Sequence, residues 1–302
     1  MSGSDEPALL VVVGPTASGK TELAIELAER CNGEIVSADS VQVYRHFELG
    51  TGKPNAEERA RARHHLVDIM EPEQHCDAAH WATLAEQALT EIRSRAKTPI
   101  VCGGTFLWVR VLIYGLAAAP PANAEIRARH AALARERGRA ELHGALARVD
   151  PETAQRLSPN DFVRVSRALE VQELTGVPMS RWQSEHGFRT PRHRARLLGV
   201  ERSKPELDQR IRSRALGMLE AGWVDEVRAL RERGFARARA MGSVGYRQIN
   251  EALASGAPPD DATLTDAIVR ATRVFARRQR TWLRDQPVEW LAPGALPAFS
   301  ER

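Results

Sequence analysis

Short apolar runs alternate with amphipathic stretches over the first 120 residues. Leu9–Val13 is a continuous apolar run rich in β-branched residues, which is typical of a parallel strand buried on both faces. A glycine-bounded loop follows, and Glu22–Arg30 then has helical spacing. Further strands are expected at Glu34–Ser37 and Pro99–Cys102, with a helix over His80–Ala96 between them. This alternation predicts an α/β unit with a parallel sheet.

The pattern changes after about residue 117. Ala117–Ala124 contains two consecutive prolines and is typical of a linker, whereas Glu125–Gly187 is helical and rich in Ala, Arg, Glu and Leu. Strand patterns resume at Arg196–Val200 and Val288–Leu291. We therefore predict an α/β core, residues 1–117 and 196–302, whose parallel sheet is flanked by helices and completed by C-terminal helices. An all-helical insertion domain, residues 118–195, interrupts this core.

Composition excludes several classes of protein. No apolar run approaches the roughly 20 residues that span a bilayer. Met1–Pro7 lacks the basic start and long apolar stretch of a signal peptide. The three cysteines lie far apart without a C-x-x-C motif, which argues against a disulfide framework or a zinc site. We expect a cytoplasmic protein that has no membrane partner.

The charge is unevenly distributed along the chain. Residues 1–120 hold 11 basic and 16 acidic residues, whereas the remaining 182 hold 32 basic and 23 acidic ones. Arginine supplies nearly all of the basic excess, and its planar guanidinium pairs well with phosphate. The basic second part therefore favours a polyanionic partner. The alternative is a lopsided but otherwise ordinary solvated surface.

A complete G-x-x-x-x-G-K-[ST] motif lies between the first expected strand and the first expected helix. In such a loop, backbone N–H groups cradle phosphate oxygens, the lysine adds a positive charge, and the last hydroxyl can bind Mg²⁺. The motif predicts a P-loop NTPase-like core that binds phosphates, but it does not specify a nucleotide. Its residues are Gly14, Pro15, Thr16, Ala17, Ser18, Gly19, Lys20 and Thr21.

Polar residues follow the other expected strands. Asp39 comes just after the second strand, so it should lie at the same sheet edge as the P-loop, where it could bind Mg²⁺, cap a helix or act as a general base. Gln42 could pair with an adenine edge. Gly103-Gly104-Thr105 either brings backbone and a hydroxyl to the site or forms a plain turn. Asp68, after two apolar residues, is a weak candidate for the carboxylate that a kinase or NTPase requires.

Five arginines are spaced 3, 4, 3 and 4 residues apart near the C-terminus, and on a helix they share one face. No acidic residue lies between Asp266 and Asp285 to neutralise them. We expect this arginine stripe to follow phosphates, the alternative being a solvated helix face. The stripe consists of Arg270, Arg273, Arg277, Arg280 and Arg284.

Taken together, the motifs resemble those of the bacterial tRNA dimethylallyltransferases, also called tRNA isopentenyltransferases. The similar blocks occur in the family's order and extend over nearly the whole chain. They are Gly14–Thr21, Ser37–Tyr44, Gly50–Pro54, His65–Ile69, Gly103–Thr105, Pro159–Asp161 with Arg164 and Arg167–Val171, Gly245–Gln248 and Arg278–Trp282.

The resemblance implies transfer of a dimethylallyl group from dimethylallyl pyrophosphate to N6 of the adenosine next to the tRNA anticodon on its 3′ side. It implies that the P-loop holds the donor's pyrophosphate, with Mg²⁺ on the Thr21 hydroxyl. Asp39 would be the base, and Thr105 would stabilise the leaving group with Arg214, or with Arg210 as the alternative. The protein would act as a monomer on the tRNA anticodon stem-loop. Implied tRNA contacts are Asp39, Ser40, Val41, Gln42, Arg164, Arg167, Gly245, Tyr246, Arg247, Arg273 and Arg277.

Three other functions share some of these features. A P-loop kinase for small molecules would use the first part of the chain but would leave the arginine stripe without a purpose. A prenyltransferase that acts on free AMP would have little need of the helical insertion. A non-catalytic RNA-binding protein could use a nucleotide as a switch.

Overall fold

The computed structural model describes residues 8–256 and 261–298 and divides the chain into two compact units. The first unit is Met1–Ile113 with Arg192–Arg302, and the second is Tyr114–Pro191. The boundaries expected from composition, after residues 117 and 195, lie four residues later in both places. None of the described helices is long and apolar enough to cross a membrane.

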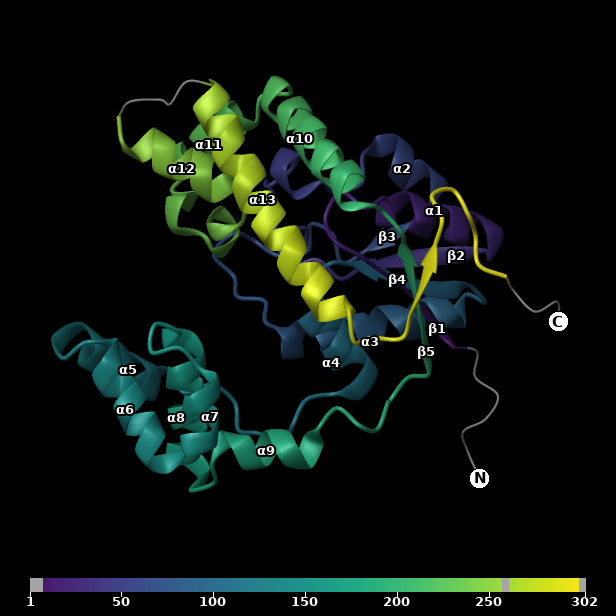
Figure 1. Ribbon diagram of the computed structural model, residues 1–302. Coiled ribbons are helices and arrows are strands. Elements are labelled where there is room, and N and C mark those ends of the chain that lie inside the picture. Colours follow the sequence, from purple (N-terminus) through teal and green to yellow (C-terminus); the bar gives the residue numbers. More distant parts are fainter. Residues whose placement is uncertain (1–7, 257–260, 299–302) are drawn as a thin grey trace, which may run out of the picture. The chain divides into compact units, whose positions relative to one another are not determined.

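A six-stranded parallel sheet organises the first unit (Figure 1). Its order, β3-β2-β4-β1-β5-β6, places the P-loop strand β1 between β4 and β5. The strands are β1 (Leu9–Val13), β2 (Gly33–Ser37), β3 (His64–His65), β4 (Thr98–Gly103), β5 (Ala195–Val200) and β6 (Val288–Leu291). Because all strands are parallel, the loops that follow β1, β2 and β4 emerge at one edge of the sheet.

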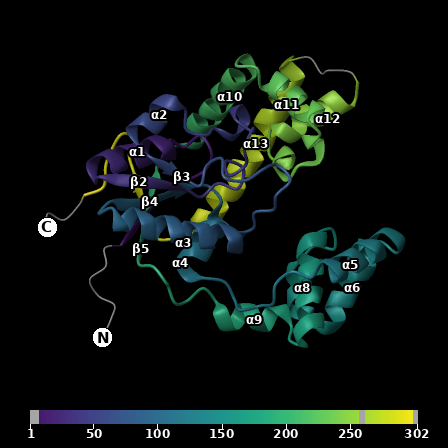
Figure 2. The same cartoon turned by 180° about the vertical axis from the view of Figure 1, so that it is seen from behind.

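Helices cover both faces of this sheet. Leu10 and Val12 of β1 pack with Leu23 and Leu27 of α1, whereas α3 lies on the opposite side in both views (Figures 1 and 2). The helices of this unit are α1 (Lys20–Arg30), α2 (Ala56–Arg61), α3 (Ala78–Ser94), α4 (Phe106–Tyr114), α10 (Lys204–Glu220), α11 (Trp223–Glu232), α12 (Tyr246–Ala254) and α13 (Asp261–Leu283). Three short 3₁₀ turns, η1 (Leu49–Thr51), η2 (Phe235–Arg237) and η3 (Arg239–Gly242), join some of them.

The second unit is a bundle of short helices with its own core. Leu142, Leu146, Val165 and Leu169 are buried together between α6 and α8. Helix starts are capped by aspartates, since Asp150 accepts a hydrogen bond from the Thr153 N–H and Asp161 accepts one from the Arg164 N–H. The helices are α5 (Ala124–Glu136), α6 (Arg139–Val149), α7 (Pro151–Arg156), α8 (Phe162–Thr175) and α9 (Met179–His186).

Candidate active site

The P-loop connects β1 to α1 as the motif predicts. Gly19 has a φ of +100°, a left-handed conformation that glycine adopts without strain, and Lys20 begins the helix immediately after it. The Lys20 Nζ is half-buried and lies 3.4 Å from the Pro15 carbonyl oxygen. Burial lowers the pKa of Lys20, and the nearby Arg214 charge acts in the same direction. A bound anion would offset both effects, so the loop favours an anionic ligand.

Two arginines from the C-terminal part of the chain donate hydrogen bonds to carbonyl groups of the P-loop. Arg210 of α10 donates from Nε to the Ala17 carbonyl at 2.7 Å, and Arg202 donates from Nε to the Ser18 carbonyl at 3.2 Å. These bonds satisfy carbonyls on the side of the loop opposite its N–H groups. Arg210 is therefore held by the loop itself, which leaves it less free than Arg214 to follow a ligand.

Asp39 lies just beyond β2, at the P-loop edge of the sheet. Its Oδ1 accepts hydrogen bonds from the N–H groups of Val41 and Gln42, at 2.9 and 3.3 Å. No donor binds its Oδ2 within the part of the chain that the structure describes. Asp39 therefore caps a turn and not a helix, and this cap is compatible with a role as a base, because Oδ2 is available for proton transfer.

The Thr105 hydroxyl is hydrogen-bonded to Ser40, the residue that follows Asp39. It accepts a hydrogen bond from the Ser40 N–H at 3.0 Å and donates one to the Ser40 Oγ at 3.3 Å. The Thr105 N–H also donates to the Ala38 carbonyl at 3.1 Å. The turn after β4 is therefore bonded directly to the turn that carries Asp39.

Three cavities meet at this edge of the sheet, and Arg214 lines all of them. The largest of these three, about 800 Å³, contains Asp39, Ser40, Val41 and Thr105 and is called the largest active-site cavity. A small one of about 70 Å³ connects Asp39 with Lys20 and Thr21, and a third of about 650 Å³ lies outside the P-loop. Ligands that enter from the two larger cavities could therefore meet beside Asp39 and Arg214.

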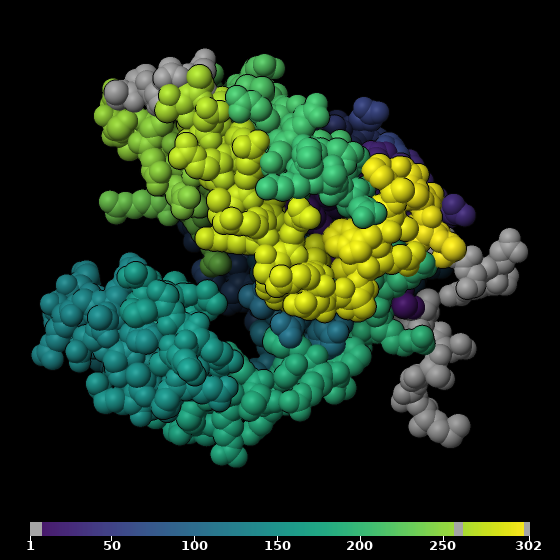
Figure 3. Space-filling model, viewed as in Figure 1, coloured from purple at the N-terminus to yellow at the C-terminus, as the bar shows by residue number. Residues whose placement is uncertain are grey.

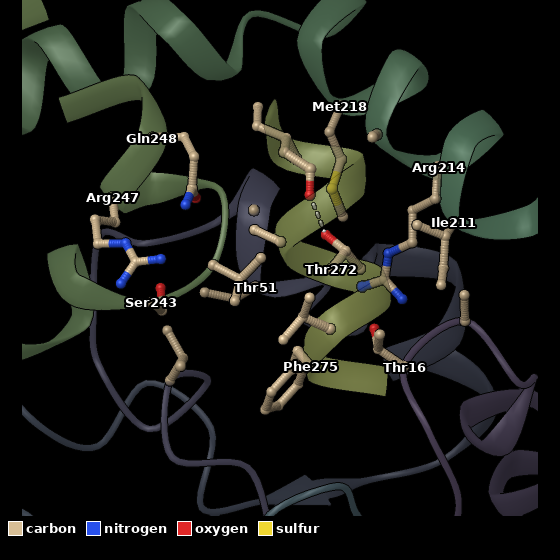
Figure 4. Close-up of a pocket in the computed structure, with 18 of the residues that line it drawn as sticks. Thr16, Thr51, Ile211, Arg214, Met218, Ser243, Arg247, Gln248, Thr272 and Phe275 are labelled. Atoms are coloured by element: carbon tan, nitrogen blue, oxygen red, sulfur yellow. Dashed lines mark hydrogen bonds between the residues drawn. The ribbon is translucent and has the colours of Figure 1, made fainter. Parts of the chain in front are cut away.

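The largest active-site cavity is enclosed by the C-terminal helices (Figure 4). Arg214 enters it from α10 on one side, and Arg247 and Gln248 of α12 lie on the other. Thr272 and Phe275 of α13 lie between them. The Phe275 ring is 41% exposed, so this cavity offers an apolar surface beside two guanidinium groups.

Arg214 differs from Arg210 in its surroundings. No acidic group or hydrogen-bond acceptor holds its guanidinium among the described residues. A Cβ on Gly52 would overlap that guanidinium, so the glycine provides its space. Desolvation lowers the pKa of Arg214, and Asp39 partly offsets this effect. These surroundings favour Arg214 over Arg210 as the residue that binds the leaving group.

The residues after Lys20 suit a magnesium ion that is held mainly by its ligand's phosphates. The Thr21 hydroxyl lines the same small cavity as Asp39 and has no hydrogen-bond partner in the described chain. No cluster of three or more histidine, cysteine or acidic residues that could hold a metal by itself is found among the described residues. Because Mg²⁺ commonly binds one hydroxyl or carboxylate together with phosphates and water, this donor set fits it.

Two of the expected tRNA contacts are wrong, because the structure buries them. Tyr246 is fully buried; its hydroxyl donates to the Glu226 carboxylate and accepts a bond from the Gly50 N–H at 3.2 Å. Gly245 is also buried, since a Cβ there would overlap the Trp223 ring. This part of the motif holds η1 in place. Arg247 is exposed and lines the largest active-site cavity, so its contact with RNA stays a prediction.

The amide of Gln42 is also engaged within the protein. Its Oε1 accepts from the Ser37 hydroxyl at 2.9 Å, and its Nε2 donates to the Gly52 carbonyl at 2.9 Å and weakly to that of Thr51 at 3.4 Å. Pairing with an adenine edge would require breaking these bonds. These bonds orient the loop that faces Arg214, and the contact of Gln42 with the adenine stays a prediction.

In the helical unit, Arg164 and Arg167 have different environments. Arg167 donates to the fully buried Glu170 and, at 2.6 Å, to the Pro120 carbonyl, so its guanidinium is held within the helical unit and its RNA contact stays a prediction. Arg164 is exposed and, among the described residues, is paired only with Asp161 of its own helix turn. It remains a candidate for phosphate binding.

The stripe arginines are exposed; four of them lie on α13, which is yellow in the space-filling view (Figure 3), and Arg284 directly follows this helix. Arg270 lines the largest active-site cavity, whereas the other four line a separate groove of about 920 Å³ that also contains Trp290. The expectation that no acid neutralises the stripe is wrong at two positions, the first being Arg284, whose Nε lies 3.8 Å from the Asp285 Oδ1. Asp208 of α10 lies 3.3 Å from the Arg273 Nε, which the sequence of α13 alone could not show.

The prediction that Asp68 supplies the carboxylate of an NTPase is wrong. The two Asp68 oxygens pair with Lys53 and Arg59, and burial, which alone would raise its pKa, is outweighed by these bonds, so the pKa is lowered. The carboxylate therefore stabilises the loop after β2. This pairing removes one weak argument for a kinase.

Sequence reasoning assigned no individual role to Gln279. Its side chain bonds the P-loop and the turn after β4 at the same time. The only sequence signal was its place in the block Arg278–Trp282, which did not say what the glutamine contacts.

The sequence of this chain is similar to those of known proteins. The family model described as IPP transferase matches residues 42–286. A tRNA dimethylallyltransferase of Sorangium cellulosum is 64% identical over 284 residues, which are 94% of this chain and 90% of that protein. Another, from Myxococcus xanthus, is 44% identical over 299 residues, or 98% of this chain and 96% of its own.

Solved structures are similar as well. The tRNA isopentenylpyrophosphate transferase of Bacillus halodurans matches with a TM-score of 0.69 at 33% identity, over 95% of this chain and 90% of that one. A eukaryotic dimethylallyltransferase acting on tRNA matches with a TM-score of 0.80 at 26% identity, over 95% of this chain and 74% of its own. The chain therefore belongs to the IPP transferase family.

Proposed function

We propose that this protein transfers the dimethylallyl group of dimethylallyl pyrophosphate to N6 of the tRNA adenosine on the 3′ side of the anticodon. The names of its relatives support a prenyl transfer to tRNA. The observation that carries the proposal is the free Oδ2 of Asp39, in a cavity shared with Lys20, Thr21 and Arg214. A base and an anion site are thus adjacent.

The reaction needs both the base and the anion site. The exocyclic amine of adenine is a poor nucleophile, because its lone pair is delocalised into the ring. In the proposed step the N6–carbon bond forms, the carbon–oxygen bond to the diphosphate breaks, and Asp39 accepts the proton that N6 loses. The allylic carbon can bear positive charge, so neutralising the leaving diphosphate should lower the barrier most.

The chain supplies several groups for that neutralisation. Lys20, the N–H groups at the start of α1 and the Arg214 guanidinium surround the cavities where the diphosphate would lie. Thr105 holds Ser40 and thereby the turn of Asp39. Mg²⁺ bound at Thr21 would add positive charge to the leaving group.

The adenosine must leave its stack to reach Asp39. We propose that it enters the largest active-site cavity, where Ser40 and Arg247 are accessible, and that the protein acts as a monomer. Exposed arginines would hold the RNA backbone by charge more than by sequence. They are Arg164, Arg273 and Arg277, together with the rest of the stripe.

The test incubates unmodified bulk tRNA with Mg²⁺ and dimethylallyl pyrophosphate, without ATP, and measures nucleoside masses. We expect a gain of one dimethylallyl group on adenosine. Asp39→Asn should keep tRNA affinity and lose at least about 100-fold in turnover, in the range of general-base catalysis. Asp225→Asn, at an exposed carboxylate on α11, serves as the matched control.

Two results would contradict the proposal. No mass gain with the wild-type protein, together with ATP turnover in a parallel reaction, would favour a kinase or NTPase. Equal losses of tRNA binding and turnover in Asp39→Asn would make Asp39 a structural residue.

A further inference from the structure

Gln279 is a buried amide in the arginine-rich part of α13, and only 5% of it is exposed. Its Oε1 accepts a hydrogen bond from the Thr16 N–H of the P-loop at 2.8 Å, and its Nε2 donates to the Gly104 carbonyl at 3.0 Å. One side chain of the C-terminal helix thus bonds two loops that are far apart in sequence.

Both loops belong to the proposed reaction site. Thr16 lies within the phosphate-binding loop, and Gly104 directly precedes Thr105, whose hydroxyl holds the turn of Asp39. A displacement of the Gln279 amide would therefore change the distance between the anion site and the base. Because Thr16 gives its N–H to Gln279, this N–H does not point toward a phosphate.

The second glycine of the pair at the end of β4 is explained by the same contact. A Cβ on Gly104 would overlap the Gln279 Nε2, and a Cβ on Gly103 would overlap the Ala38 carbonyl. The second glycine is therefore needed for the close approach of α13, not for a turn that favours left-handed backbone. The space for the amide is part of the architecture of the site.

We propose that Gln279 is a positioning residue for prenyl transfer, which fixes the separation of the P-loop and the Thr105 turn. This inference rests on the proposed function, since the anion in the P-loop is taken to be the donor's diphosphate. Placement errors of about 1 Å at a reacting centre cost on the order of 100-fold in rate, so loss of one amide can have a large effect.

The first variant is Gln279→Met, which keeps the length of the side chain and removes both hydrogen bonds. We expect kcat/KM for dimethylallyl pyrophosphate to fall at least tenfold, the affinity for Mg²⁺-pyrophosphate to fall severalfold, and tRNA affinity to stay within about threefold. Gln286→Met is the matched control, because that glutamine follows α13 and lines none of the three active-site cavities.

The second variant, Gln279→Glu, tests the pH dependence of activity relative to wild type, which a purely structural role of Gln279 would not change. A protonated carboxyl has one donor and one acceptor like the amide, whereas the ionised form cannot donate to Gly104. Because this position is only 5% exposed, burial should raise the pKa of the new carboxyl from about 4.3 toward neutral, so activity relative to wild type should rise as pH falls from 8.5 to 6. The titratable and charged groups that share the small cavity are common to both proteins and cancel in this ratio: Lys20, Asp39, His64, Cys102 and Arg214.

The outcomes separate this inference from the proposed function. Wild-type affinity for Mg²⁺-pyrophosphate and wild-type kcat/KM in Gln279→Met would overturn the role of Gln279. Activity equal to wild type at every pH in Gln279→Glu would do the same, and this variant keeps the test valid where the methionine protein fails to fold. If wild-type protein transfers no prenyl group, the proposed function fails, while pyrophosphate affinity still tests the loop geometry.

Discussion

Salt dependence of tRNA binding gives the sharpest test of the arginine stripe. Each phosphate that a protein neutralises contributes about 0.7 to 0.9 to the slope of log K against log salt. Arg277 has no acidic partner among the described residues, so Arg277→Gln should flatten the slope by one such step. Between 50 and 200 mM salt, this step changes the relative affinity about threefold.

Arg273 should behave differently because Asp208 lies 3.3 Å from its Nε. A guanidinium that is already paired releases fewer counterions, so Arg273→Gln should change the slope by less than Arg277→Gln. Asp208→Asn removes the competing charge and should steepen the slope. The order of these three slopes follows from the structure and not from the spacing of the arginines along α13.

The assay is fluorescence anisotropy of a labelled anticodon stem-loop at four or more salt concentrations. Arg228→Gln is the control, since this exposed arginine pairs with Asp225 on α11 and lies outside the groove. An unchanged slope in Arg277→Gln would show that the stripe does not contact the RNA phosphates. Equal slopes for the Arg273 and Arg277 variants would refute the argument from Asp208.

Three further predictions concern the interior and the anion site. Tyr246→Phe keeps the buried ring but loses its bond to Glu226, so urea denaturation should show about 1.5–3 kcal/mol lower stability. Burial alone would raise the pKa of Glu170, but its hydrogen bonds outweigh burial and lower it. The contribution of Glu170 to the free energy of unfolding is therefore present above about pH 4.3 and is lost as the pH falls. Glu170→Gln should weaken the acid dependence of unfolding. Arg214→Gln should reduce kcat/KM for the prenyl donor about 10- to 100-fold, and Arg210→Gln should reduce it less.

Much of the fold could be predicted from periodicity alone. The run Leu9–Val13 has the bounds of β1, and the expected helix Glu22–Arg30 begins only two residues after the start of α1. The two-residue strand β3 (His64–His65) was missed, because so short an edge strand has no hydrophobic pattern. Buried strands carry their signal locally, whereas an edge strand depends on its neighbour.

The P-loop and Asp39 could be placed together because a parallel sheet brings the carboxyl ends of its strands to one edge. The hydrogen bonds of Asp39 then show why the interpretations as a cap and as a base were both reasonable. Sequence shows which residue follows the strand, but the orientation of each carboxylate oxygen depends on the turn at Val41 and Gln42.

Three of the expected tRNA contacts share one physical feature. Gln42, Arg167 and Tyr246 are polar residues within the motifs, and each has its partners inside the protein, at Gly52, Glu170 and Glu226 respectively. A motif indicates that a side chain is required without showing whether the ligand or the fold requires it. A buried polar group must find a partner, so a ligand contact should be assigned only where burial leaves an atom free. In the described chain Asp39 meets that criterion through Oδ2 and Arg214 through its guanidinium, which is why the proposed chemistry depends on these two residues.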